Sequence, residues 1–254
     1  MNDVTLTPAA ALAERVIEAT RTTGHLDLAP DRRASALSAL ETIGYPTTRD
    51  ERWKYTRVAR VQQLEFAPAP AAPAAPPAVL PELGAHRLVF VDGQFVSGEG
   101  VNTNGSFIGP LSRAMVDCPD RLSALESDHF AGTEWFAALQ ASAPQDGGAV
   151  LIPDGVTLDK PVFIHHHLSA GTHVAQPQHL VVVGKESRAE VIVWTTTDAD
   201  ADGLYNGAIT ADLGEHAYLG LEIVQDEHGD AHHIGHHQFR QAASSKLEVR
   251  TATA

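Results

Sequence analysis

The chain has 254 residues, of which 43% are hydrophobic and 20% are charged, a composition typical of globular proteins rather than disordered ones. Its 32 acidic and 18 basic side chains give a formal charge of −14, which repels phosphate backbones and anionic lipids, so we expect neither nucleic-acid nor membrane binding. With a single cysteine, Cys118, and no secretion-signal pattern at its start, the sequence predicts a cytoplasmic protein without an internal disulfide.

Two short helices are predicted near the start of the sequence. Thr7 can cap the first helix, Pro8 suits its first turn, and Gly24 can close it. The second helix is expected from about Pro30 to Ile43, where apolar residues share one face and Gly44 follows as a C-terminal glycine. The next stretch contains a proline turn and is too charged to be core throughout.

A proline-rich segment then divides the chain. Residues 67–81 read APAPAAPAAPPAVLP, and because proline lacks a backbone donor and has a fixed φ, this segment is predicted to be a semi-rigid linker. The predicted organisation is a helical N-terminal region over residues 1–66, the Ala/Pro-rich linker, and a β core over residues 82–254. We expect this core to be incomplete at its C-terminal end.

The pattern after the linker indicates β-structure. Residues 86–96 predict two short strands around an Asp-Gly turn, and residues 120–142 predict one further helix. That helix is expected to make its apolar contacts through Leu122, Leu125, Trp135, Phe136 and Leu139. Further strands are expected over residues 149–153, 161–168, 179–184, 189–196, 207–213, 217–224, 234–239 and 246–252. Their spacing fits an antiparallel sandwich or a parallel β-helix, and the scarcity of two-residue hairpin turns favours the β-helix.

Four segments, in order, resemble the SufB/SufD family. Residues 51–61, ERWKYTRVARV, are similar to its E-x-W-K-Y-T segment, and residues 88–95, LVFVDGQF, to its LVFVNGxF strand pair. Residues 135–169 resemble its ALN-x-A, P-x-G-V-x-L and P-I-x-I-x-H pattern, with glutamine in place of the usual asparagine. Residues 205–227 resemble its N-x-x-x-x-x-L-G-E-N-A-x-L segment, with His216 in the asparagine place. The short helical start leading directly into WKYT favours a SufD-type member.

The resemblance implies both a fold and a function. The fold is mainly β, a right-handed parallel β-helix core preceded by a small helical N-terminal region. The function is that of a non-catalytic scaffold subunit in the SUF machinery for iron–sulfur cluster assembly, which pairs with a SufB-type scaffold and a SufC-type ATPase. The positions that the family implicates in cluster assembly lie toward the C-terminal end of its β-helix, beyond this sequence, so the resemblance assigns no site residue here.

Histidine is the residue type that could carry chemistry, with fourteen copies. Alternation along a strand places His165 and His167 on one face and His166 on the other. A second cluster comprises His232, His233, His236 and His237. Neighbouring imidazoles can share a metal ion, but no acidic or thiol ligand completes either cluster locally. We therefore expect partly exposed histidines rather than a metal site.

Two further features could mark a site. Trp53, Lys54 and Tyr55 are consecutive bulky residues that could contact a partner, although packing onto the β core is the favoured interpretation. Cys118 could accept sulfur, but no base or cation is adjacent in sequence, so an ordinary thiol is expected. Without a phosphate-binding loop, a nucleophile elbow or a zinc-binding helix motif, the sequence predicts no catalytic, cofactor-binding or metal residues and no enzymatic activity.

The sequence leaves two alternative functions open and predicts an exposed sheet edge. The alternative functions are a His-rich metal-binding or cupin-like enzyme domain, whose ligand spacing the sequence does not keep, and a β-helix used only for self-assembly. The last strands, residues 234–239 and 246–253, are expected to form an exposed edge that pairs with a second copy to give a homodimer. In the final strand we expect Leu247 and Val249 to face inward.

Overall fold

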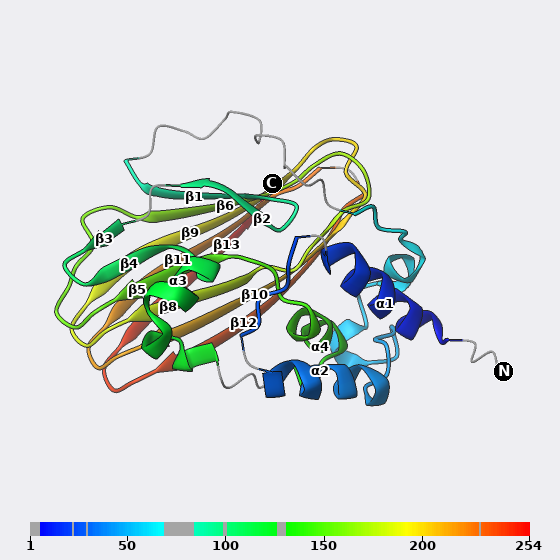
Figure 1. The fold of residues 1–254 in the computed structure, drawn as a ribbon, viewed down its shortest axis with the longest axis horizontal. Helices are drawn as coiled ribbons and strands as arrows, with labels where there is room; N and C mark the ends of the chain where they lie inside the picture. The colour runs from blue at the N-terminus through cyan, green and yellow to red at the C-terminus, as the bar shows by residue number, and fades with distance from the viewer. Residues whose placement is uncertain are drawn as a thin grey trace.

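Two stacked sheets, built from strands that alternate between them, form the body of the protein in this computed structural model (Figure 1). The structure describes residues 6–21, 23–28, 30–68, 84–98, 101–125, 131–228 and 230–254. The predicted linker over residues 67–81 lies outside the described residues except for its first two positions.

The strands fall into a six-stranded and a seven-stranded sheet. Sheet A contains, in spatial order, β13 (Lys246–Thr253), β11 (Tyr218–Asp226), β9 (Arg188–Thr197), β6 (Val162–Leu168), β1 (His86–Val91) and β2 (Gln94–Gly98). Sheet B contains β12 (His232–Gln241), β10 (Leu204–Leu213), β8 (Gln178–Val183), β5 (Gly148–Ile152), β4 (Ser106–Pro110) and β3 (Val101–Thr103), with β7 (Val174–Ala175) pairing to β10.

From β5 onward the chain winds as a coil, since the main strands alternate between sheet B and sheet A. Neighbouring coils pair in parallel with a nearly constant offset. Ala149 pairs with Leu180, 31 residues later, and Tyr218 pairs with Lys246, 28 residues later. The predicted parallel β-helix is therefore confirmed, and each of the eight strands expected after Ala149 is present.

One turn of every coil contains a residue in the left-handed region. Gly155, Glu186, His216 and Ser244 have φ values of 72°, 56°, 57° and 59°. Their backbone N–H groups stack, because those of Gly155, Glu186 and His216 donate to the carbonyl oxygens of Lys185, Glu215 and Ala243 at 2.8, 2.9 and 3.1 Å. The turn thus repeats its backbone geometry while its side chains change completely.

The helices pack on the outer face of sheet B (Figure 1). They are α1 (Pro8–Arg21), α2 (Pro30–Thr42), α3 (Leu111–Asp117) and α4 (Trp135–Ser142), with 3-10 turns η1 (Glu51–Trp53), η2 (Ala59–Gln63), η3 (Pro119–Arg121) and η4 (Ser123–Leu125). Leu12 and Val16 of α1 and Phe136 of α4 form one buried cluster with Val174 and Leu204 of the coil. Among the described helices, none is long and apolar enough to cross a membrane.

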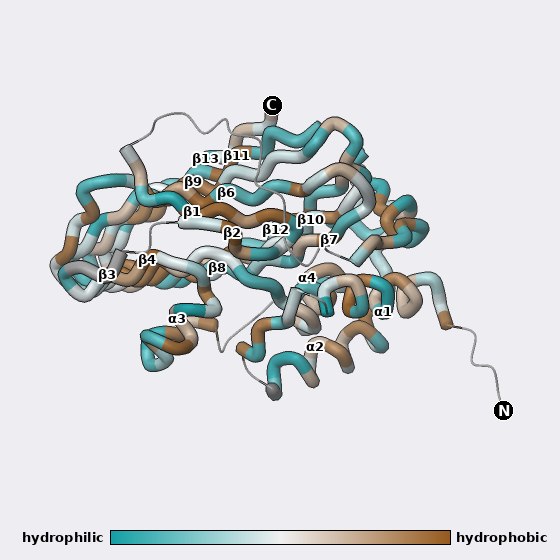
Figure 2. The backbone as a smooth tube through the Cα atoms, turned by 45° about the horizontal axis from the view of Figure 1, so that its top comes forward, coloured by the Kyte–Doolittle hydropathy of each residue, from teal (hydrophilic) through white to brown (hydrophobic). Residues whose placement is uncertain are grey.

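The space between the sheets holds the largest apolar core. Its members include Val150, Ile164, Val181, Val191, Ile209 and Leu221. Figure 2 shows hydrophobic stretches along the strands around β1 and β6. Such packing is the main stabilising contribution, at about 25 cal/mol per Å² of apolar surface removed from water.

Several local predictions are confirmed. The side chain of Thr7 accepts a hydrogen bond from the backbone N–H of Ala10 (3.2 Å), and Gly24 has a φ of 80°. The Asp-Gly turn is present between β1 and β2, where Asp92 and Gly93 have φ values of 48° and 77°. Gly44 differs from the expectation, since its φ is not among the positive values.

The helix predicted over residues 120–142 is wrong in extent. In the second part of this range only α4 is helical. The N-cap residue of α4, Glu134, is extended, with φ and ψ of −128° and 126°. The first part forms the separate turns η3 and η4. Leu122 and Leu125 consequently join a different apolar cluster from Trp135, because the two parts turn toward different places on the coil.

The repeated left-handed turn makes a stability prediction. Gly155→Ala should lower the free energy of unfolding by about 1–2 kcal/mol, because a Cβ at Gly155 meets no atom within 4 Å and only the backbone conformation opposes it. Glu186→Asn should raise it by about 0.5–1 kcal/mol, since asparagine adopts this region more readily than glutamate. Urea unfolding measures both changes. Gly44→Ala is the matched control, with equal space and no positive φ; an equal loss there would contradict the assignment.

The outermost strands of the coil generate a second prediction. Among the described residues, β12 and β13 each have a neighbour on one side only, and Val249 is 42% exposed while Leu247 packs on the core. Lys246 donates its N–H inward to Ala217, so strand alternation turns the N–H of Val249 toward the open edge. We expect the chain to self-associate there as its concentration rises.

Val249→Pro should shift this association toward monomer, because proline removes an outward donor and leaves the bonds to β11 intact. Size-exclusion chromatography with light scattering across a wide concentration range measures it. The control is Glu248→Pro, which removes an inward donor and should lower stability instead. A chain that stays monomeric at high concentration would refute the prediction.

Candidate functional site

The three consecutive histidines of β6 are divided by strand alternation, as predicted. His166 faces the space between the sheets together with Ile164, whereas His165 and His167 face outward from sheet A. Their expected partial exposure is wrong, because they are only 2%, 2% and 4% exposed for His165, His166 and His167. Burial of both faces of β6 explains the difference: every residue of this strand is buried.

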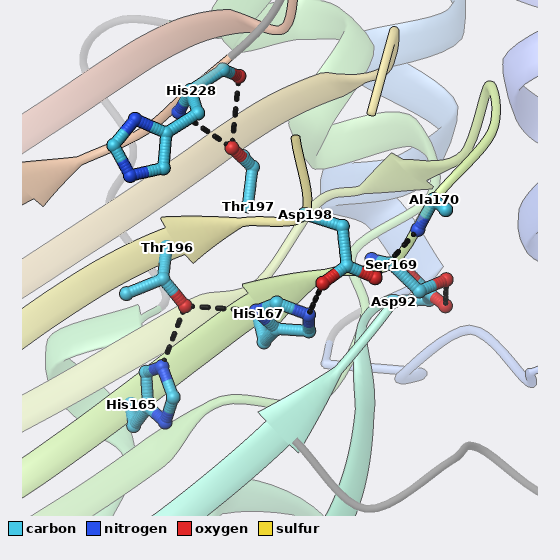
Figure 3. Close-up of polar contacts among 9 residues, drawn as sticks. All are labelled: Asp92, His165, His167, Ser169, Ala170, Thr196, Thr197, Asp198 and His228. Carbon is cyan, nitrogen blue, oxygen red and sulfur yellow. Dashed lines mark hydrogen bonds and ion pairs between the residues drawn. The ribbon is translucent and has the colours of Figure 1, made fainter. Parts of the chain in front are cut away.

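The outward histidines belong to a polar cluster on β6 and β9 (Figure 3). The Oγ1 atom of Thr196 lies between two rings, 2.7 Å from Nε2 of His165 and 2.8 Å from Nδ1 of His167. The other nitrogen of His167, Nε2, lies 3.4 Å from Oδ1 of Asp198. The indole of Trp194 stacks on His165 with ring centroids 4.8 Å apart. Each imidazole is therefore held in place by hydrogen bonding or stacking.

The same cluster continues into the loops at the ends of the strands (Figure 3). Ser169 donates from its N–H to Oδ1 of Asp92 (3.0 Å) and from its hydroxyl to Oδ2 (2.6 Å). In the next coil Asp198 accepts the N–H of the residue after Ser169 at 3.0 Å, and Thr197 exchanges hydrogen bonds with the backbone of His228. Side-chain oxygens at this end of the coil thus bind the backbone of neighbouring loops.

The chemistry open to the outer cluster follows from this geometry. Thr196, His167 and Asp198 have the order hydroxyl, imidazole and carboxylate that nucleophilic catalysis uses. However, the hydroxyl is shared with His165, whose pKa is lowered to about 4 by burial and then by the charge of His167. A nucleophile also needs open approach, and three cavities of the described residues, of about 210, 270 and 460 Å³, are lined by other residues. We interpret the cluster as structural.

The inward His166 lies in an aromatic group that spans both sheets. Its ring stacks on Phe90 (centroids 4.6 Å apart) and meets His179 and Tyr205 edge-on at 4.8 and 5.7 Å. Tyr205 in turn stacks on His233 at 4.5 Å. The structure therefore connects the two histidine clusters of the sequence through residues that sequence reasoning missed, His179 and Tyr205.

The interior imidazoles are held in their neutral form. Burial, and then the charge of His237, lowers the pKa of His179 to about 3, and its Nδ1 accepts the N–H of Gly148 at 3.0 Å. Burial and the neighbouring histidines also hold the pKa of His166 well below its ordinary value. Among the residues that the structure describes, no three His, Cys, Asp or Glu side chains are grouped so that they could hold a metal ion.

The remaining histidines of β12 face in both directions. Nδ1 of His233 lies 2.9 Å from the carboxylate of Glu227. On the outer face of sheet B, Nε2 of His236 lies 3.1 Å from Oδ1 of Asn206, and the Nδ2 of Asn206 donates to the carbonyl of Phe136 in α4 and to Oε1 of Gln176, both at 2.9 Å. This amide contact fastens the helices to the coil and was not predicted.

The WKYT segment separates into a packed and an exposed part. Trp53 packs on Phe136 of α4 with ring centroids 5.4 Å apart, as the favoured interpretation requires. Tyr55 is instead 90% exposed, and the Lys54 ammonium lies 5.5 Å from its ring centroid. Cys118 is half-buried at the end of α3, where its N–H donates to the carbonyl of Ala114 at 2.8 Å.

Comparison with known protein families gives two consecutive matches that together extend from residue 18 to residue 254. Residues 18–164 match the family described as SufBD protein N-terminal region, and residues 165–254 match the family described as SUF system FeS cluster assembly, SufBD core domain. The chain belongs to the SufBD family. The boundary between the two SufBD matches falls inside β6, so they divide one continuous fold.

The chain is also similar to a curated protein that carries the SufBD family name. An iron–sulfur cluster assembly SufBD family protein of Synechocystis sp. is 28% identical to the chain over 247 residues. The match covers 86% of the chain and 52% of that relative, so the chain spans about half of the relative's length. The family resemblance is thus confirmed at the level of SufBD.

Buried neutral histidines predict a pH dependence. When folding lowers the pKa of a histidine, each unit of lowering reduces the free energy of unfolding by about 1.4 kcal/mol. The full reduction applies once the pH lies below the pKa of the folded state. His165 has a pKa of about 4 when folded and an ordinary value of 6.5, so it has no effect above pH 6.5 and destabilises progressively between pH 6.5 and 4. We expect the free energy of unfolding to fall over this range and His165→Gln to reduce the slope.

Urea unfolding at a series of pH values measures the effect. His228→Gln is the control, because that side chain is 68% exposed and its bonds to Thr197 use only its backbone. A pH slope that is the same in His165→Gln as in the unchanged chain would refute the assignment.

Proposed function

We propose that the chain is a SufD-type scaffold subunit that supports iron–sulfur cluster assembly in the cytoplasm, together with a SufB-type partner and a SufC-type ATPase, and that it has no catalytic activity of its own. The observation that carries the proposal is the pair of consecutive SufBD matches over residues 18–164 and 165–254. The direct passage from the helical region into the WKYT segment supports SufD over SufB. In such a system the iron–sulfur cluster is the cargo and not a resident cofactor of the chain.

The physical features of the coil support a scaffold role. Stacked parallel coils provide long, continuous sheet faces on which another subunit can dock. The proposed division is a helical region over residues 1–66, a linker over residues 67–81 and a β core over residues 82–254. The helices and the core share a buried apolar cluster, which suits a subunit that moves as one unit.

The alternative of a cupin-like enzyme domain is disfavoured by topology. Cupins are double-sheet jelly rolls built from antiparallel strands. Here β5, β8, β10 and β12 pair in parallel, as do β6, β9, β11 and β13. The histidines are spread over the interior and two outer faces, so they do not converge on one ligand set within the described residues.

Co-expression tests the proposal. The chain should co-purify with a SufB-type and a SufC-type protein from the same genome as one complex of defined mass, measured by size-exclusion chromatography with light scattering. Free of these partners, it should show no ATP hydrolysis. Failure of all pairwise and three-way combinations to associate, or hydrolysis that purified chain retains, would refute the scaffold role.

A further inference from the structure

Tyr55 is an exposed aromatic residue within a basic stretch of the sequence. Its side chain is 90% exposed, the highest value among the exposed large hydrophobic residues of the described chain. Arg49, Lys54 and Arg57 are exposed around it in sequence. Within the described part of the chain, these three cations take part in no ion pair. We call these four residues the Tyr55 surface.

The charge of the Tyr55 surface contrasts with that of the molecule. The chain carries −14 overall, yet residues 41–60 contain five basic and three acidic residues. Two of those cations are already used, since Arg52 pairs with Glu134 and Arg60 pairs with Asp202 at 3.1 Å. The carboxylate of Asp50 is also used, because it accepts the N–H of Thr47 at 2.7 Å. The exposed Glu51 and the more distant Glu41 oppose three uncommitted cations.

An aromatic groove adjoins this surface. A cavity of about 460 Å³ has apolar walls from Ile43, Tyr45, Trp53 and Trp135. Its lining also includes three carboxylates, of which Asp50 accepts a hydrogen bond from Thr47, Glu134 pairs with Arg52, and Glu51 is exposed. A second cavity of about 270 Å³ shares Trp53 with the first and extends to Ile234 on β12. Tyrosine, tryptophan and arginine are the residues that most often dominate the binding energy of protein interfaces. Pockets with apolar walls thus lie next to three cations that take part in no ion pair within the described residues.

We propose that the Tyr55 surface and this groove form a docking site for an acidic protein segment. An apolar side chain of the segment occupies the groove, its carboxylates meet Arg49, Lys54 and Arg57, and Tyr55 packs against its backbone. The Debye length of about 8 Å at physiological ionic strength lets a short segment respond to local charge. A long nucleic acid or an anionic bilayer would extend beyond the basic surface and meet the repulsion of the acidic body. The docking site is additional to the proposed scaffold role and does not rest on it.

Peptide selection tests the proposal. A randomised twelve-residue peptide library displayed on phage is panned against the folded chain, and the enriched peptide is labelled with fluorescein and titrated by fluorescence anisotropy. We expect an acidic consensus with one or two aromatic or aliphatic residues. The Kd should rise about tenfold or more in Tyr55→Ala and in the double variant Lys54→Glu, Arg57→Glu, and it should rise with salt.

The controls separate contact from folding and from overall charge. Tyr55→Phe should retain binding, and Lys160→Glu changes one exposed cation elsewhere on the coil and should leave the Kd unchanged. Thermal unfolding of each variant reports its folding. The proposal is overturned if no peptide is enriched, if the consensus is not acidic, or if the variants bind equally.

Three further outcomes would also overturn it in favour of a different occupant. The first is binding of a single-stranded 20-mer oligonucleotide that Arg57→Glu abolishes. The second is binding of phosphatidylserine vesicles that Arg57→Glu abolishes. The third is a Tyr55-dependent dimer, detected by light scattering.

Discussion

The parallel hydrogen-bond ladder between successive coils is the constraint on which the rest of the molecule depends. It requires each coil to return to the same register after 28 to 31 residues, as Ala149 with Leu180 and Tyr218 with Lys246 show. A slip of one residue would move every side chain of a strand to the opposite face. This single register therefore determines three features at once: which histidines are interior, which side chains contact the helices, and where the apolar core lies.

Much of the fold was predictable because it depends on local sequence. Short apolar runs between turn residues located the eight strands after Ala149, and the Asp-Gly pair located the hairpin of β1 and β2. The coil period was not visible because glycine, glutamate, histidine and serine occupy the same left-handed position in successive turns. A repeated backbone conformation leaves no sequence repeat when several residue types can adopt it at modest cost.

The histidine clusters show where sequence reasoning ends. Alternation along β6 correctly placed His165 and His167 opposite His166, since it needs only the strand itself. Burial could not be predicted, because the covering atoms belong to residues distant in sequence. The meeting of His166 with His179 and Tyr205 requires the two sheets and the coil offset to be known.

The helical region depends on buried amides for its attachment. Asn206 and Gln176 bond to each other, to α4 and to neighbouring backbone, and a buried amide left without such partners would cost about 1–3 kcal/mol. The buried side chain of Gln140 reaches the carbonyl oxygens of Gln176 and Pro177 at 3.5 and 3.4 Å. Polar contacts thus orient the helices, while the apolar cluster supplies most of the stability.

The two ends of the coil obey different rules of length. At the left-handed end the connections from β8 to β9, from β10 to β11 and from β12 to β13 all contain four residues, namely 184–187, 214–217 and 242–245. The connection from β5 to β6 has the same four-residue turn, residues 153–156, before Thr157 bridges to Arg188, and it adds further residues only after that bridge. At the opposite end the connections shorten from residues 169–177 to 198–203 and then to 227–231. Because lengthening a flexible loop adds only about 0.6 kcal/mol per doubling, this second end can accept inserted segments without disturbing the strands. The turns at the left-handed end of the coil therefore keep a fixed length. The loops at the opposite end are where evolution, or an engineer, can insert new sequence.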